Sequence, residues 1–151
     1  APRQLERIKQ IRENLKKTKF QFAFLSNLAY PPVETQILVA DTMGLLGALY
    51  KVGTLAFVGG SIVKKGGHNF LEAAILKKPV FFGKHYYHTP DVAKALLKSG
   101  GGILVSKTNF SRELKKYLND EALLNKSAQA ALDSAISFKG ATAKTLEVIK
   151  L

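Results

Sequence analysis

The sequence predicts an α/β fold, with a Rossmann-like, mainly parallel sheet and helices on both faces. Short apolar runs, typical of strands buried on both faces, alternate with stretches of helical composition. The central runs begin about 24 residues apart, a spacing that matches βαβ units. With 151 residues, 46% of them hydrophobic, the chain is long enough for a sizeable core. We therefore expect residues 1–151 to form one domain.

The first part of the chain predicts a helix, two strands and a loop. Apolar residues three or four apart, with charged residues between them, indicate an amphipathic helix. Two apolar runs after it read as strands, and two prolines mark the loop that separates them. The expected bounds are residues 4–17 for the helix, 20–25 and 36–40 for the strands, and 26–34 for the loop.

The middle of the chain alternates regularly between the two element types. The expected strands are residues 55–58, 79–82 and 103–105, and the expected helices are residues 45–51, 70–77 and 90–99. From Ser111 onward the chain is predicted to be helical, with apolar stripes that extend to Ile136, and a last short helix is expected at residues 141–149.

The charge balance favours anionic partners. The chain has 23 Lys and Arg against 11 Asp and Glu, a formal net charge of +12, and no cysteine for a disulfide or thiolate site. Solvated helix faces account for many of the lysines. No arginine-rich tract or alternation of aromatic and basic residues indicates nucleic-acid binding. No apolar run reaches the roughly 18 residues of a membrane span, and we expect the chain as given to be soluble.

Residues 59–74, GGSIVKKGGHNFLEAA, have the pattern of an anion-binding turn between a strand and a helix. Gly66 and Gly67 permit a backbone turn that residues with a Cβ resist. Asn69 is expected to be the N-cap of the helix, with Glu72 at its third position as in a capping box. Unpaired N–H groups and the helix dipole would then attract phosphate. The side chains that would add donors are Lys64, Lys65 and His68.

A second interpretation of this stretch stays open, in which Asn69 and Glu72 only cap a helix and the glycines only make a turn. Two better-known phosphate loops are excluded. The Walker pattern needs a glycine where Lys65 stands, and no stretch reads G-x-G-x-x-G. A metal site built on His85 and His88 is disfavoured because no third ligand stands near them in the sequence.

Polar residues and glycines follow four of the predicted strands. In open α/β sheets the ligand lies beyond the carboxyl ends of the strands, so these loops are expected to line one edge and form a pocket. Turn chemistry by itself would also place glycine and aspartate there. The residues are Asp41 and Thr42, Gly59 to Ser61, Gly83 to His85, and Ser106 with Lys107.

Residues 41–50, DTMGLLGALY, and 57–83, FVGGSIVKKGGHNFLEAAILKKPVFFG, resemble the donor-binding domain of the Kdo (3-deoxy-D-manno-octulosonic acid) transferases. The combination of D-T-x-G, G-G-S and G-G-H-N-x-x-E is more specific than any of the three motifs alone. The resemblance implies the C-terminal half of a GT-B glycosyltransferase. Its parent enzyme would transfer Kdo from CMP-Kdo to lipid A precursor in lipopolysaccharide biosynthesis, with inversion and without a metal or other cofactor.

The resemblance also assigns donor-binding residues by position. Gly66, Gly67, His68 and Asn69 would surround the CMP phosphate, and Glu72 would accept hydrogen bonds from the ribose hydroxyls. The other candidates are Arg3 near the donor phosphate, Met43 and Gly44 near the cytosine, and, as secondary candidates, Ser61 and Lys65.

Three positions depart from the family pattern. Leu45 stands where the family has a glutamate, Phe70 replaces a usual proline, and Gln4 replaces a histidine. Because Leu45 has no carboxylate, the nucleotide contacts that the family makes from the Asp41 loop through this glutamate are not carried over. The phosphate turn is intact.

Family members are more than twice as long as this chain, so we expect a fragment that lacks the N-terminal acceptor domain and the first strands of the donor domain. The resemblance places the base in that absent domain, so no catalytic residue is predicted here. The implied partners are the CMP-Kdo donor, the lipid A precursor acceptor and the membrane surface. The implied location of the parent enzyme is the cytoplasmic face of the bacterial inner membrane.

Two other function classes are compatible with parts of the sequence. A non-catalytic basic domain that binds phosphorylated ligands or an anionic membrane surface would explain the net charge. A flavodoxin-like or dinucleotide-binding oxidoreductase would suit the fold class but lacks the fingerprint. Binding of CMP separates the transferase hypothesis from the basic domain, and absence of flavin absorbance and of an NAD response would exclude the oxidoreductase.

Overall fold

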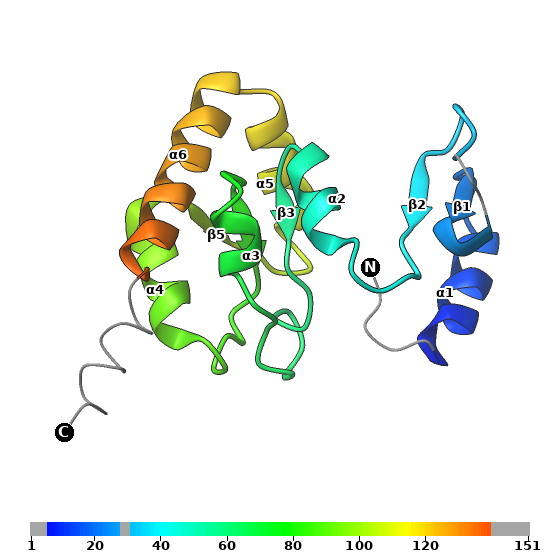
Figure 1. The fold of residues 1–151 in the computed structure, drawn as a ribbon, viewed down its shortest axis with the longest axis horizontal. Coiled ribbons are helices and arrows are strands. Elements are labelled where there is room, and N and C mark those ends of the chain that lie inside the picture. The colour runs from blue at the N-terminus through cyan, green and yellow to red at the C-terminus, as the bar shows by residue number, and fades with distance from the viewer. Residues whose placement is uncertain (1–5, 28–30, 140–151) are drawn as a thin grey trace. The chain divides into compact units, whose positions relative to one another are not determined.

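The computed structural model describes residues 6–27 and 31–139. The chain divides into two compact units, Ala1–Leu49 and Tyr50–Leu151, and the described strands form two parallel sheets (Figure 1). The α/β class with parallel strands is confirmed, but the expectation of a single sheet is wrong for the described strands. A short apolar run identifies a strand without identifying its hydrogen-bonded neighbour. The predicted helix at residues 141–149 lies outside the described residues.

The described residues of the first unit include an α-helix and a two-stranded sheet. Its elements are α1 (Glu6–Lys16), β1 (Phe22–Phe24), the 3-10 helix η1 (Leu25–Asn27) and β2 (Ile37–Val39). The two strands pair in parallel with Phe24 opposite Val39, and both of these side chains are buried. The Arg12 guanidinium of α1 lies 3.9 Å from the centre of the Phe24 ring. This cation–π contact joins the helix to the sheet.

The second unit contains a three-stranded parallel sheet and most of the helices. The unit boundary falls within α2 (Leu46–Val52). The elements that follow are β3 (Ala56–Phe57), α3 (Leu71–Ala74), β4 (Val80–Phe82), α4 (Pro90–Ser99), β5 (Gly102–Leu104), α5 (Phe110–Leu118) and α6 (Glu121–Ser137). The strand order is β3-β4-β5, with β4 in the centre.

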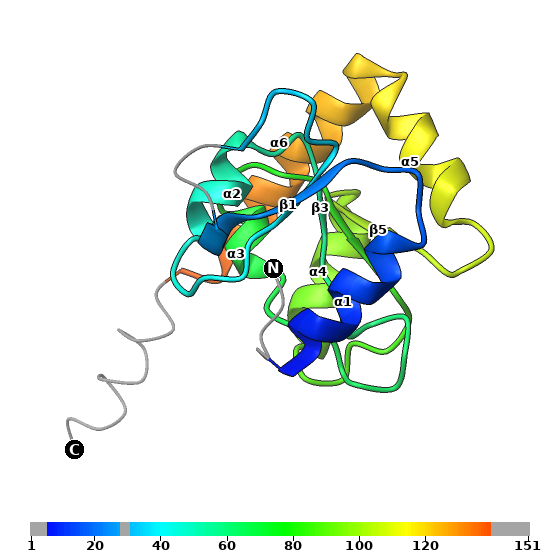
Figure 2. The same ribbon diagram turned by 90° about the vertical axis from the view of Figure 1, so that its right-hand side faces the viewer.

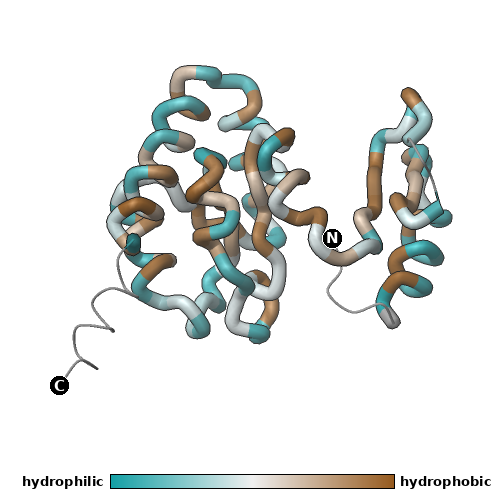
Figure 3. The backbone as a smooth tube through the Cα atoms, in the orientation of Figure 1, coloured by the Kyte–Doolittle hydropathy of each residue, from teal (hydrophilic) through white to brown (hydrophobic). Residues whose placement is uncertain are grey.

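Both faces of β4 are covered by helices, as predicted. Val80 and Phe82 point to a core that also contains buried residues of α3, α4 and α6. Phe81 points to the other face, where it packs with Ile103 and the α5 residue Tyr117. Figures 1 and 2 show α4 and α6 on one side of this sheet. Figure 3, in which the tube is coloured by residue hydropathy, shows segments of hydrophobic residues in the centre of the unit. The strand is thus buried on both faces.

The predicted helix over residues 70–77 is too long at both ends. In the structure α3 extends only over Leu71–Ala74. After Ile75 the hydrogen bonds change to the shorter i to i−3 pattern, from Leu76 to Ala73 and from Lys77 to Ala74. Lys77 then adopts a φ of 58°, which turns the chain toward β4. The sequence carries no glycine signal at this position, because the left-handed residue is a lysine.

None of the helices within residues 6–27 and 31–139 is long and apolar enough to cross a bilayer.

Candidate functional site

The loop between β3 and α3 forms the turn that the glycine pattern predicts. Gly60, Gly66 and Gly67 have φ values of 78°, 83° and 75°. These values lie in the left-handed region, which residues with a Cβ adopt only with strain. Gly66 and Gly67 are buried, and His68 and Asn69 are exposed. The His68 ring lies 3.4 Å from the position that a Cβ on Gly60 would occupy.

The expected N-cap of the helix at Asn69 is wrong by one residue, because the N-cap is Phe70. The Asn69 side chain accepts a hydrogen bond from the Leu71 N–H at 3.0 Å, two residues ahead, which is the pattern of an Asx turn. This turn already gives Phe70 helical dihedral angles, and the Phe70 carbonyl accepts the first helical bond, from Ala74. The Asn69 amide also donates to the Glu72 carboxylate at 3.2 Å. Asn69 therefore orients Glu72 through its side chain and not through a capping box.

The turn offers fewer unpaired N–H groups than the pattern predicts. The Gly67 N–H donates to the Gly60 carbonyl at 3.0 Å, and the Leu71 N–H is used by Asn69. Among the described residues, the N–H groups of Gly66, Asn69 and Phe70 donate to no hydrogen bond. Because α3 has only four residues, its dipole is small. Attraction of an anion to this turn thus depends on individual N–H groups and side chains.

Ser61 holds the turn to the loop that follows β4. Its side chain is completely buried. The hydroxyl donates to the Val58 carbonyl at 2.8 Å and accepts from the Gly83 N–H at 2.8 Å, and the Ser61 carbonyl accepts from the His85 N–H at 2.9 Å. A Cβ on Gly83 would lie 2.4 Å from the Ser61 carbonyl oxygen, so only glycine fits there. Ser61 therefore positions the turn through these hydrogen bonds, and its contact with a donor stays a prediction.

A groove of about 310 Å³ runs beside Glu72. Asn69 and Glu72 line it from the α3 side, and Phe138 and Lys139 line it from the end of α6. Sequence reasoning did not select Phe138 or Lys139, which lie far from the glycine motif in the chain. The groove is rimmed by a carboxylate, an amide and an ammonium group around apolar walls. Such a lining suits a ligand that has hydroxyl groups and a negative charge.

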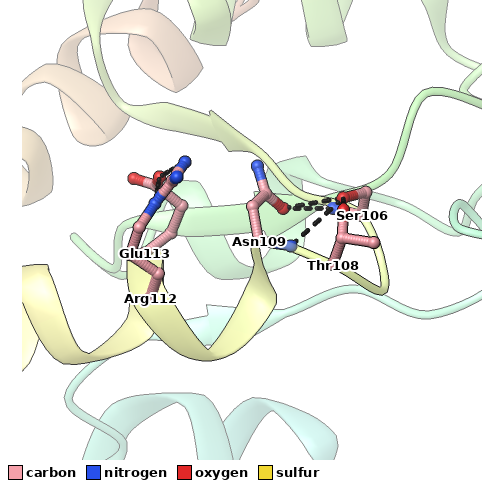
Figure 4. A network of polar contacts seen from close by, with 5 residues as sticks. All are labelled: Ser106, Thr108, Asn109, Arg112 and Glu113. Atoms are coloured by element: carbon pink, nitrogen blue, oxygen red, sulfur yellow. Dashed lines mark hydrogen bonds and ion pairs between the residues drawn. The ribbon is translucent and has the colours of Figure 1, made fainter.

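A second cavity, of about 320 Å³, lies at the carboxyl ends of the strands. It is lined by Ile62, Lys84, Leu104, Val105, Ser106, Lys107 and Asn109. The loops after β3, β4 and β5 thus meet at one edge, as expected for parallel strands. Figure 4 shows how the last of these loops is held: Asn109 Oδ1 accepts from the Ser106 N–H at 2.6 Å and from the Ser106 hydroxyl at 3.0 Å. The N–H and the hydroxyl of Ser106 are therefore already hydrogen-bonded within the protein. Lys84 and Lys107 supply the charge of this cavity.

The other predicted donor-binding residues lie elsewhere or outside the described residues. Met43 is 86% exposed and Gly44 has a φ of 86°, both in the loop after β2 of the first unit. Their approach to the Gly66 turn of the second unit stays a prediction. Lys65 is exposed beside the turn. Arg3 lies outside the described residues. No cluster of three potential metal ligands occurs in the described ranges.

Comparison with known proteins identifies relatives over nearly the whole chain. No protein-family profile matches it. The chain is 35% identical over 152 residues to the 3-deoxy-D-manno-octulosonic acid transferase of Haemophilus influenzae, covering 99% of this chain and 36% of that protein. It is 38% identical over 111 residues to the Chlamydia pneumoniae transferase of the same name, covering 71% of this chain and 24% of that protein. It is 36% identical over 124 residues to a bifunctional glycosyltransferase/methyltransferase of Fusobacterium nucleatum, covering 80% of this chain and 19% of that protein.

The fold has a counterpart among solved structures. The crystal structure of the C-terminal CMP-Kdo binding domain of WaaA from Acinetobacter baumannii matches with a TM-score of 0.81 and 23% identity, covering 89% of this chain and 70% of that chain. This likeness confirms the predicted fold. The curated relatives confirm the predicted resemblance to Kdo transferases, and the chain spans 36% of the length of the Haemophilus protein.

Proposed function

We propose, from the homology of this chain with the 3-deoxy-D-manno-octulosonic acid transferases, that it is the donor-binding domain of a GT-B glycosyltransferase. The parent enzyme would transfer Kdo from CMP-Kdo to lipid A precursor. The observation that carries the proposal is the coincidence of this homology with the left-handed glycine turn. The turn lies between a strand and a helix, where ligands bind in open α/β sheets.

The proposed donor contacts divide into three groups. The unpaired N–H groups of Gly66 and Asn69, with the side chains of His68 and Lys65, would hold the phosphate of CMP. Glu72 would accept hydrogen bonds from the ribose hydroxyls in the groove that it lines, and its hydrogen bond with Asn69 supports this orientation. The loop with Met43 and Gly44 would approach the cytosine, and Arg3 would approach the phosphate.

The chemical role of these contacts is to stabilise the leaving group. When the bond between Kdo and CMP breaks, negative charge develops on the CMP phosphate. Donors already held in place by the fold stabilise that charge without rearrangement. The chain's own residues would thus bind the nucleotide and assist its departure.

The base of the reaction would come from outside this chain. Inversion requires a base on the acceptor hydroxyl, on the face of the sugar opposite the departing CMP. Two carboxylates belong to the motifs that resemble the family: Glu72 would face the ribose, and Asp41 is hydrogen-bonded to Ser26. The acceptor and the base would therefore be supplied by an N-terminal domain of the parent enzyme.

The proposed location of the parent enzyme is the cytoplasmic face of the bacterial inner membrane, where it would meet its lipid acceptor. The formal charge of +12 supports attraction to an anionic membrane surface. The alternative of a non-catalytic basic domain is not favoured, because the relatives at 33–38% identity are named as transferases.

Calorimetric titration of CMP and CMP-Kdo onto the 151-residue chain tests this proposal. We expect one binding site for each ligand, and cytidine, which lacks the phosphate, should bind at least about tenfold more weakly than CMP. UMP and GMP serve as nucleotide controls. Absence of CMP and CMP-Kdo binding at millimolar ligand, with the chain folded, would contradict the proposal.

A further inference from the structure

His88, in the loop after β4, makes two hydrogen bonds to the glycine turn. Its backbone N–H donates to the Gly66 carbonyl at 3.2 Å, and its ring nitrogen Nδ1 lies 3.3 Å from the Gly67 carbonyl oxygen. A carbonyl oxygen can only accept a hydrogen bond, so Nδ1 must carry the proton. The turn is therefore held by its carbonyl groups from the loop that precedes α4.

The shapes of His88 and Gly66 also fit each other. A Cβ on Gly66 would lie 2.5 Å from the Cε1 atom of the His88 ring, a separation that real Cβ atoms do not reach. The Tyr87 ring packs edge-on against the His88 ring, with centroids 5.0 Å apart. Glycine at position 66 therefore avoids both the strain of a left-handed φ and displacement of the His88 ring.

The hydrogen bond from Nδ1 fixes the orientation of a peptide group that belongs to the proposed phosphate site. The peptide bond is planar and trans, so the Gly67 carbonyl and the His68 N–H point in opposite directions. Because His88 holds the carbonyl, it also sets the direction of the His68 N–H. The preceding peptide is held in the same way, between His88 and Gly60.

We propose that His88 is a positioning residue of the phosphate turn. It does not touch the donor in this role. It holds the two peptide groups that follow Gly66 and Gly67, so that the path of the turn is fixed before the phosphate arrives. The inference rests on the proposed function only for the identity of the ligand, CMP, because the contacts of His88 to the turn are properties of the free protein.

Two substitutions separate the hydrogen bond from the packing of the ring. His88→Phe keeps a planar ring beside Gly66 but has no N–H to donate. His88→Asn keeps a donor near the position of Nδ1 but removes most of the ring. We expect His88→Phe to weaken CMP binding about three- to tenfold, as for the loss of one neutral hydrogen bond, with less than a twofold change for cytidine. His88→Asn should restore CMP affinity to within about twofold of the parent chain.

Hydrogen exchange of the Gly67 amide supplies a readout that needs no ligand. The Gly67 N–H is bonded to Gly60, so it reports whether the turn is held. His88→Phe should speed its exchange about three- to tenfold while amides in β4 are unchanged, and His88→Asn should restore the protection.

The outcomes distinguish this inference from the proposed function. If the parent chain binds no CMP, the proposed function fails, and the exchange of Gly67 still decides whether His88 holds the turn. If His88→Phe changes neither CMP affinity nor Gly67 exchange, the inference is overturned. Equal losses for CMP and cytidine, or loss of CMP binding in His88→Asn as large as in His88→Phe, would also overturn it.

Discussion

The carboxylate of Asp41 accepts two hydrogen bonds from Ser26, from the backbone N–H at 2.9 Å and from the hydroxyl at 2.6 Å. Ser26 belongs to η1, which follows β1, and Asp41 follows β2, so the pair joins the ends of the two strands. The hydroxyl hydrogen bond lowers the pKa of Asp41 below its ordinary value. A lowered pKa makes the carboxylate a weaker proton acceptor, which disfavours Asp41 as a base.

We expect the stability of the first unit to depend on acid pH through this pair. A carboxylate with a lowered folded pKa stabilises the fold above its unfolded pKa of about 3.9, and this contribution is lost as the pH falls through the folded value. Ser26→Ala should therefore flatten the pH dependence between about pH 5 and pH 2. The free energy of unfolding of the first unit at each pH can be measured by urea titration, with the amide signals of β1 and β2 as the probe. Identical pH profiles for parent and variant would show that the pair contributes nothing.

Glu72→Ala should weaken CMP binding about tenfold or more while the chain stays folded. The lost hydrogen bonds would be those from the ribose hydroxyls to a charged group, which are stronger than neutral ones. Calorimetry measures the affinity and circular dichroism the fold. Glu121→Ala, in the first turn of α6, is the matched control and should bind CMP as the parent does. Tight CMP binding by Glu72→Ala would leave the carboxylate with no role beyond its contact with Asn69.

Replacement of His68 by alanine should reduce affinity for CMP more than for cytidine. The side chain follows the glycine pair directly, and the expected lost contact is to phosphate. A difference of about threefold or more between the two losses would support the assignment. Equal losses for the two ligands would remove His68 from the phosphate site.

The 151-residue chain should catalyse no transfer by itself, because the acceptor and its base must be held on the opposite face of the sugar. CMP release and Kdo-lipid formation are to be followed after incubation with CMP-Kdo and lipid A precursor, with a full-length transferase as the positive control. Turnover comparable to that of the control would contradict this prediction. If Asp41→Asn then abolished that turnover, Asp41 would be the base.

Gly101→Ala should destabilise the second unit by about 1–3 kcal/mol or more, because overpacking forces backbone shifts. A Cβ at this position would lie 2.4 Å from the Ala131 Cα of α6, and helix backbone cannot move aside easily. Gly59→Ala is the control, since its Cβ would meet nothing within 4 Å. The free energy of unfolding in urea should stay within about 0.5 kcal/mol of the parent for Gly59→Ala. A Gly101→Ala variant as stable as this control would contradict the close packing of α6.

Local patterns in the sequence determined the type of most described elements and, in places, their ends. The bounds predicted for α4, residues 90–99, agree with the structure. Proline at its first position and Gly100 after its last, with a φ of 82°, are start and stop signals that act within one turn of the helix. The short α3 shows the limit. Its early end at a left-handed lysine has no such local signal.

The candidate site was determined in part by the sequence and in part by the tertiary structure. The glycine turn and the pairing of Asn69 with Glu72 follow from residues within one short segment, and such contacts can be read from spacing. Three other features cannot be read from spacing. They are the burial of Ser61, the hydrogen bond between His88 and Gly67, and the position of Phe138 beside Glu72. These contacts join residues 21 to 66 positions apart, as with His88 and Gly67 at 21. Which distant groups meet is decided by how the strands pair and the helices pack, because backbone propensity acts only on near neighbours in the chain.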